Sequence, residues 1–243
     1  MDQTTSRAEP VSPAVAATAQ PAAAPPSAVV VVRPSGSTLA RHAMWTLPAY
    51  ALGRMWLSLV AEPDPAGDPQ AWAARVTGDA YQRAQLLVGL AGELLVLVAV
   101  VALAALVSGR GRVLASAGLL AGLAAAVLAL PRWTATGVVA PVLGEAVSGR
   151  ELDAAEWYGE ILARTDPAAA VAGGLLGLAF VLLGTAGWRS RALGRAEGLL
   201  LVVAGPLLAA AAWYEPMLTP LGALPLLAAG LAIAWSAGRP RWP

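Results

Sequence analysis

The chain has 243 residues, of which 58% are hydrophobic and only 13% are charged, about half the charged fraction of an ordinary soluble domain. A soluble protein of this length could not bury so much apolar surface, so the composition predicts an integral membrane protein. The net charge of +1 argues against a nucleic-acid partner, and the absence of cysteine excludes disulfides and cysteine-ligated metals. With a single histidine, His42, we expect neither a metal centre nor a cofactor.

The first 40 residues are rich in alanine and proline and show no hydrophobic periodicity. We interpret residues 1–40 as a disordered tail on the cytoplasmic side of the membrane. They do not resemble a signal peptide, because the start MDQTTSR lacks a basic region and the apolar run at 28–32 is too short and is followed by Arg33.

The first apolar segment, residues 42–61, is the weakest candidate for a membrane span because it contains Pro48 and Arg54. In its favour, its length is adequate and tryptophans lie toward both of its ends. The alternative is an amphipathic helix that lies on the membrane surface. The acidic loop that follows ends in Asp68 and Pro69, a pair that predicts the N-cap and first turn of a short helix.

Five further apolar segments are long enough to cross a bilayer, which takes about 20 residues. The longest is 84–108, whose only ionisable residue is Glu93. The others are 113–130, 168–187, 198–214 and 221–237. Residues 41–238 are therefore predicted to form a six-helix transmembrane bundle, and 239–243 a short second cytoplasmic tail.

The longest predicted connection is residues 134–167, which follow Pro131 and carry six of the 15 acidic side chains. Ser148 and Glu151 have the spacing of a capping box, and the residues after them alternate between an apolar and a charged face with helical periodicity. We expect short interfacial helices here, on the outer side of the membrane. The acidic face of Asp153, Glu156 and Glu160 fits solvent exposure better than cation binding.

The sign of the charge alternates from one connection to the next, and this pattern predicts the topology. Arginines lie in the first tail, at 109–112, in 188–195 and in the last tail, whereas the connections between them are acidic. Lys and Arg accumulate in short cytoplasmic loops. Six spans with both termini in the cytoplasm satisfy every connection, and the exclusive use of arginine as the basic residue suggests a high-GC bacterium and its inner membrane.

Two ionisable residues, Arg54 and Glu93, lie within predicted spans, where a charge costs roughly 2.5–3.5 kcal/mol. At 1.5 Å per residue, Arg54 would lie about 10 Å and Glu93 about 14 Å below the outer surface. The two spans are consecutive and antiparallel, so an intramembrane ion pair is the leading interpretation. The alternatives are an Arg54 that reaches the interface beside a protonated Glu93, and a proton- or ion-coupled site.

Weaker signals concern helix packing. Gly118 and Gly122, and again Gly173 and Gly177, have GxxxG spacing, which favours close helix packing but indicates no specific dimer. Pro206 is a candidate kink in the fifth span, which is more often tolerated than functional. Glu197 begins that span, where a carboxylate favours the helix N-terminus.

No catalytic motif is present in the sequence, which lacks GxSxG, HExxH and any glycine-rich loop followed by lysine. We therefore expect a non-enzymatic structural or accessory component of the bacterial envelope. Its partners would be the lipid bilayer and other membrane or envelope proteins, contacted through the acidic outer loops. The alternative is a small-solute or ion transporter that uses Arg54 and Glu93.

Overall fold

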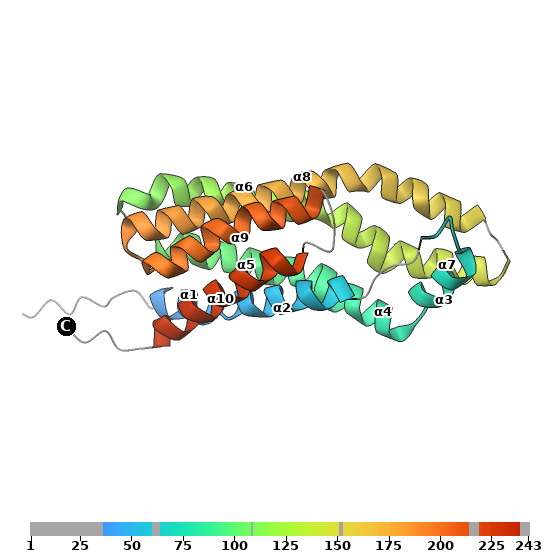
Figure 1. The fold of residues 1–243 in the computed structure, drawn as a ribbon, viewed down its shortest axis with the longest axis horizontal. Coiled ribbons are helices and arrows are strands. Elements are labelled where there is room, and N and C mark those ends of the chain that lie inside the picture. Colours follow the sequence, from blue (N-terminus) through green and yellow to red (C-terminus); the bar gives the residue numbers. More distant parts are fainter. Residues whose placement is uncertain (1–35, 60–63, 108, 151–152, 214–218, 239–243) are drawn as a thin grey trace, which may run out of the picture. The chain divides into compact units, whose positions relative to one another are not determined.

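The computed structural model describes residues 36–59, 64–107, 109–150, 153–213 and 219–238, and most of the predicted N-terminal tail and all of the C-terminal tail lie outside these ranges. Within them every regular element is a helix, so the predicted all-α class is confirmed. In chain order the elements are α1 (Gly36–Ala43), α2 (Thr46–Leu59), α3 (Pro69–Val76), α4 (Asp79–Ala84), η1 (Gln85–Leu90), α5 (Ala91–Leu106), η2 (Gly109–Gly111), α6 (Arg112–Thr134), η3 (Ala135–Val139), α7 (Ala140–Ser148), α8 (Asp153–Ser190), α9 (Arg195–Trp213) and α10 (Thr219–Gly238) (Figure 1).

Five helices of the described chain are long and apolar enough to cross a membrane. They are Asp79–Leu106, Gly109–Ser148, Asp153–Ser190, Arg195–Trp213 and Thr219–Ser236. The predicted first span, 42–61, is not among them, because its described part is divided between α1 and α2. Pro48 explains the break: it has no N–H to donate to the carbonyl of Met44, and the helix is interrupted by a turn at residues 44–45.

Two helices are about twice as long as the sequence predicted. Gly109–Ser148 and Asp153–Ser190 would measure about 60 Å and 57 Å at 1.5 Å per residue, whereas the hydrocarbon core of a bilayer is about 30 Å thick. The expectation of a long connection over 134–167 is wrong, because α6 continues through Pro131 and α8 already contains Pro167. The hydroxyl of Ser148 donates to the carbonyl of Gly144, and Glu151 lies outside the described residues.

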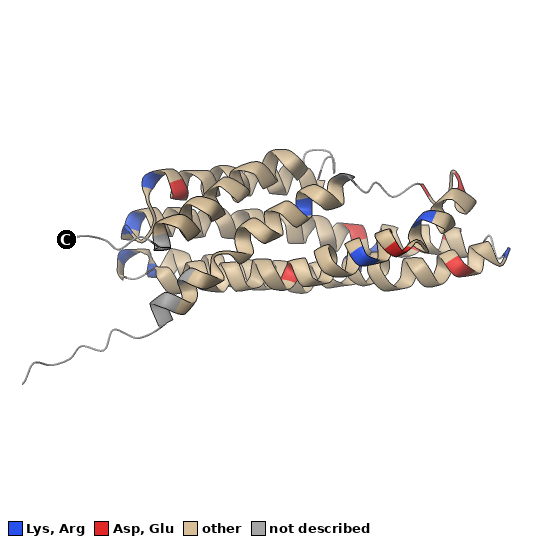
Figure 2. Cartoon of the chain, turned by 90° about the horizontal axis from the view of Figure 1, so that it is seen from below, with Lys and Arg blue, Asp and Glu red and all other residues tan. Residues whose placement is uncertain are grey.

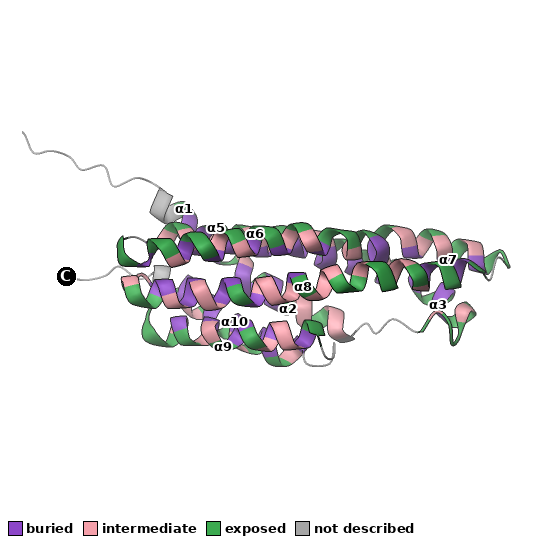
Figure 3. Ribbon diagram, turned by 90° about the horizontal axis from the view of Figure 1, so that it is seen from above, coloured by how far each residue is buried: buried purple, intermediate pink, exposed green. Residues whose placement is uncertain are grey.

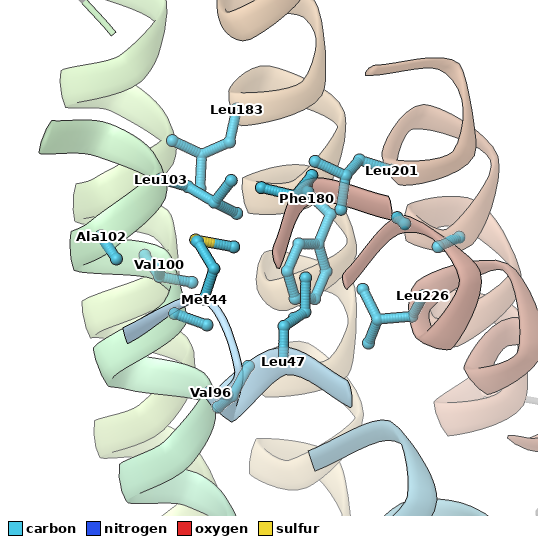
Figure 4. Close-up of a cluster of buried hydrophobic side chains, with 14 of the residues drawn as sticks. Met44, Leu47, Val96, Val100, Ala102, Leu103, Phe180, Leu183, Leu201 and Leu226 are labelled. Carbon is cyan, nitrogen blue, oxygen red and sulfur yellow. The ribbon is translucent and has the colours of Figure 1, made fainter. Parts of the chain in front are cut away.

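The core of the molecule has two parts. The larger, here called the apolar bundle, is the cluster formed by α1, α2, α5, α8, α9 and α10 with the start of α6. Its fully buried side chains converge from α2, α8, α9, α10 and the turn before α2 (Figure 4), and include Met44, Leu47, Phe180, Leu201 and Leu226. The smaller part, here called the distal cluster, joins α3, α4, η3/α7 and the first turns of α8. Packing against this second core stabilises the extra helical turns that local signals did not predict.

Helix ends follow the predicted signals at two sites. Asp68 caps α3 by accepting a hydrogen bond from the Ala71 amide at 2.9 Å, with Pro69 as the first helical residue. The carboxylate of Glu197 reaches back to the amide of Gly194 at 2.7 Å and so satisfies a free donor at the start of α9. Both are local structural roles.

Charged side chains lie mostly toward the two ends of the helices, and arginine is present at both ends (Figure 2). The turns between α5 and α6 and between α8 and α9 are basic, with Arg110, Arg112, Arg189, Arg191 and Arg195. The opposite end carries the described aspartates and all of the described glutamates except Glu93 and Glu197. Between the two ends, large apolar side chains cover the outside of the bundle (Figure 3), among them Leu94 and Val98 on α5, Leu120 and Val127 on α6, and Leu199 on α9.

Candidate functional site

A cavity of about 790 Å³ lies among the helices at the end away from the basic turns. Its wall combines residues of α2, η1, α5, α6, η3, α8, α9 and α10, and both predicted site residues, Arg54 and Glu93, line it. A cavity of this size falls in the range that holds small organic ligands. Pro206, the predicted kink, is not among its lining residues, and α9 continues through that proline.

Trp133 of α6 joins the two predicted residues. Its indole Nε1–H donates a hydrogen bond to Glu93 Oε1 at 2.9 Å, and the guanidinium carbon of Arg54 lies 5.4 Å from the centroid of its ring. That distance is typical of a cation–π contact. The direct salt bridges within the described residues do not include Arg54 and Glu93, so the structure brings these two side chains to one site through an aromatic ring. Their ion pair stays a prediction.

Buried polar side chains are concentrated at this cavity. In the described chain four polar or charged residues are buried: Gln85, Glu93, Thr136 and Thr219. All four line the cavity, although they come from four different helical segments. Burying a polar group away from water is costly unless a partner compensates for it, so their convergence on one space marks it as a site.

Three atoms at the cavity are buried without a hydrogen-bond partner: Arg54 Nε, Gln85 Oε1 and Arg132 Nη1. The two arginine nitrogens are hydrogen-bond donors with a fixed positive charge, and the glutamine oxygen is a neutral acceptor. Arg132 is held in place by Asp166 of α8, whose Oδ1 lies 3.3 Å from Nη1 in a contact that does not have hydrogen-bond geometry. Three of the described side chains that line the cavity therefore each carry a buried polar atom whose hydrogen-bonding capacity is unused.

Two π-helical segments form the backbone of the site. Gln85 lies in η1 and Thr136 in η3, and these segments pack against each other. Each widens its helix by one residue in a turn, a feature that is frequent at functional sites. Gly89, in η1, gives room to the indole of Trp133, because a Cβ there would lie 2.8 Å from the ring atom Cε3.

The remaining wall is apolar and built from small side chains. Ala125 and Ala129 of α6 and Ala172 and Gly173 of α8 line it, and Leu57 of α2 and Leu176 of α8 add larger apolar groups. The site therefore has a polar part, around Arg54, Glu93 and Arg132, and an apolar part.

Sequence reasoning identified Arg54 and Glu93 but missed the other polar residues of the site. The sequence places Arg132 and Trp133 at the end of the third predicted span, next to Pro131, and Asp166 in the predicted connection 134–167. Gln85 is the second residue of the predicted span 84–108, and the sequence assigns it no role. The signal that could have identified these residues was the presence of arginine, glutamine and tryptophan next to long apolar runs. Their convergence on one cavity, however, depends on how the helices pack.

No group of three or more His, Asp or Glu side chains within the described ranges is arranged to hold a metal ion. No family model matches the chain, and no curated protein and no solved structure is significantly similar to it. The geometry of the cavity therefore carries the functional argument.

Proposed function

We propose that this chain is a six-span protein of a bacterial inner membrane, with both termini in the cytoplasm. The five long apolar helices supply five spans, and α1 with α2 supplies a broken sixth. Residues from Gly36 to Leu59 would extend about 36 Å at 1.5 Å per residue, enough to cross the hydrocarbon core. The basic turns at one end support a cytoplasmic orientation for that end. The distal cluster then projects into the aqueous space outside.

The function that the geometry supports best is non-enzymatic binding of an amphipathic ligand in the cavity. The observation that carries this proposal is the convergence of all four buried polar residues of the described chain on one cavity, together with the unpartnered atoms of Arg54, Gln85 and Arg132. A bound molecule with a polar and an apolar part would satisfy those atoms and cover the alanine-rich wall.

Transport by Arg54 and Glu93 is the second candidate, favoured by the depth of Glu93 in α5. It requires a path from the cavity to the basic end of the bundle. On that side the space between helices is filled by Met44, Leu103 and Leu183, all fully buried (Figure 4). Packing of this density supports binding without passage. An accessory role in the envelope is compatible with binding and would use the distal cluster as its contact surface.

Filling the cavity tests the proposal directly. Ala129 of α6 is buried at the cavity, whereas Val127 of the same helix is 65% exposed on the outside of the bundle. Native mass spectrometry of protein released gently from its own host membranes should detect a retained small molecule on the unmodified chain. We expect Ala129→Phe to lose it and Val127→Phe to keep it.

The proposal fails if the unmodified chain retains nothing, or if the two variants retain the same molecule equally. Transport is read separately, in proteoliposomes that contain the purified protein and a pH-sensitive dye in their lumen. A proton flux that Glu93→Gln abolishes without lowering the unfolding temperature would favour the second candidate.

A further inference from the structure

We propose that the cavity binds a phosphoethanolamine head group, that is, a phosphate joined to a primary ammonium, carried by a membrane phospholipid. The inference rests on the proposed ligand-binding function and adds to it the chemical class of the ligand. It is argued from the charges, the unpartnered atoms and the apolar wall of the site.

The phosphate half is matched by two arginines that approach from different helices. Arg54 comes from α2 and Arg132 from α6, and each has a buried guanidinium nitrogen without a hydrogen-bond partner. Each guanidinium is already positioned, one over the Trp133 ring and the other beside Asp166. Arginine binds tetrahedral oxyanions through charge-assisted hydrogen bonds. A guanidinium group that is already held in place loses little conformational entropy on binding.

The ammonium half is matched by acceptors. Gln85 Oε1 is buried and unpartnered, and the carboxylates of Glu93 and Asp166 line the same space. Trp133 occupies one oxygen of Glu93, and a carboxylate has lone pairs for further donors. A head group that carried only a phosphate would leave the Gln85 oxygen unsatisfied, at the cost of an unmet buried acceptor.

The charge of the site selects a zwitterion. The formal charges of Arg54 and Arg132 are cancelled by those of Glu93 and Asp166, which line the same cavity. A zwitterionic head group leaves this sum at zero, whereas an anionic one adds a negative charge that no other described residue of the lining balances. Of the four charged residues Glu93 is the buried one, and a buried charge is tolerated only when it is paired.

The position and the wall of the cavity fit a lipid. Trp133 lies about 30 Å along α6 from Arg112 at 1.5 Å per residue, so the polar part of the site falls at the proposed outer boundary of the hydrocarbon core. Trp213 of α9 lines the cavity as well, and tryptophans gather at that boundary. The alanines of α6 and α8 leave an apolar space on the bilayer side of the head group for the start of an acyl chain.

The test is lipid retention by the full chain in detergent micelles, measured by native mass spectrometry with dioleoyl phosphatidylethanolamine, phosphatidylcholine and phosphatidylglycerol offered at equal concentrations. Phosphatidylcholine carries phosphate and positive charge but no donor on nitrogen, and phosphatidylglycerol carries a net negative charge. We expect phosphatidylethanolamine to be retained about tenfold more than either, the size of one hydrogen bond to a charged group.

Variants assign the selectivity to residues. Arg54→Gln and Arg132→Gln should weaken retention of every phospholipid, whereas Gln85→Leu should remove the preference for phosphatidylethanolamine over phosphatidylcholine. Arg83→Gln is the matched control, because Arg83 is 73% exposed and pairs with Asp79 outside the cavity. The unfolding temperature of each variant distinguishes loss of binding from loss of folding. A glutamine variant that fails to fold is replaced by the lysine variant that keeps the charge, Arg54→Lys or Arg132→Lys.

Each outcome decides the proposal. Equal retention of the three lipids, preference for phosphatidylglycerol, or an equal loss with Arg83→Gln overturns the head-group assignment and leaves ligand binding standing. Retention of none of them, together with no molecule retained from host membranes, overturns the proposed function itself. Displacement of the lipid by glycerophosphoethanolamine at equal concentration would assign the same chemistry to a free solute, and displacement only at large excess would assign it to the lipid.

Discussion

The apolar bundle and the distal cluster differ at their closest helix contacts. In the bundle, α8 and α9 meet backbone to backbone through glycine: Gly177 of α8 lies against the backbone of Gly205 on α9, and Gly184 against Gly198. In the distal cluster they meet through large aromatic side chains, and the rings of Trp72 and Tyr158 lie 4.9 Å apart.

The difference is the one expected if the bundle lies in lipid and the distal cluster in water. Between helices in lipid there is no hydrophobic drive for association, so close backbone contact through small residues has to supply the attraction. In water the burial of an aromatic ring is itself strongly favourable. The change in packing along α6 and α8 therefore supports a boundary between a lipid-embedded and an aqueous region, and the cavity lies at that boundary.

The largest expected effect is in the distal cluster. Trp72 is fully buried, and Trp72→Ala should lower the free energy of unfolding of this cluster by about 3–5 kcal/mol through loss of burial and creation of a cavity. Trp157→Ala is the control, since that ring is 61% exposed. Hydrogen exchange should rise in α3 and α7 and stay unchanged in α9 and α10. Equal acceleration in all four helices would mean that the two regions unfold as one.

A single added methyl group between α8 and α9 should destabilise the apolar bundle. Gly177→Ala places a methyl group against the Gly205 carbonyl, and we expect it to cost about 1–3 kcal/mol by forcing α8 and α9 apart. Gly159 lies on the same helix with open space around it, so Gly159→Ala should be neutral or stabilising through helix propensity. Thermal unfolding in detergent compares the two, and equal effects would contradict close packing as the basis of the bundle.

An effect of similar size is expected at the boundary. Trp133→Phe removes the indole N–H that donates to Glu93 and should lower stability by about 1.5–3 kcal/mol, the cost of a hydrogen bond to a charged group. In the Glu93→Gln background the same change should cost less, and a double-mutant cycle measures the difference. A coupling of zero would show that Trp133 does not hold Glu93.

The sequence was sufficient for the all-α class and for the apolar helices, because these depend on composition and on local hydrophobicity, whereas the role of Arg54 and Glu93 stays a prediction. The sequence was insufficient where packing overrides a local signal. Pro131 is a helix-ending residue by local rules, yet the turns after it are held by the distal cluster. The π-helical segments η1 and η3 change which residues face inward, and no residue type predicts a π-helix. Gln85 and Thr136 could therefore not be assigned to a site from the sequence.

The predicted first span differs from the five long apolar helices. Pro48 interrupts it, and a Cβ on Gly230 of α10 would lie 2.6 Å from Pro48 Cδ, so this proline is packed against α10. The sequence indicated both that this segment is long enough to cross a membrane and that it contains a proline. It could not show that α10 accommodates the interruption with a glycine.

The boundary between the two regions can be measured directly in this cysteine-free chain. Single cysteines at Glu156 in the distal cluster, Val127 on the outside of the bundle and Arg191 at the basic end would be exposed to a membrane-impermeant maleimide in intact cells. The account predicts labelling at 156 without permeabilisation, labelling at 191 only after it, and little at 127 in either case. Labelling at 127 as rapid as at 156, or labelling at 191 in intact cells, would contradict it.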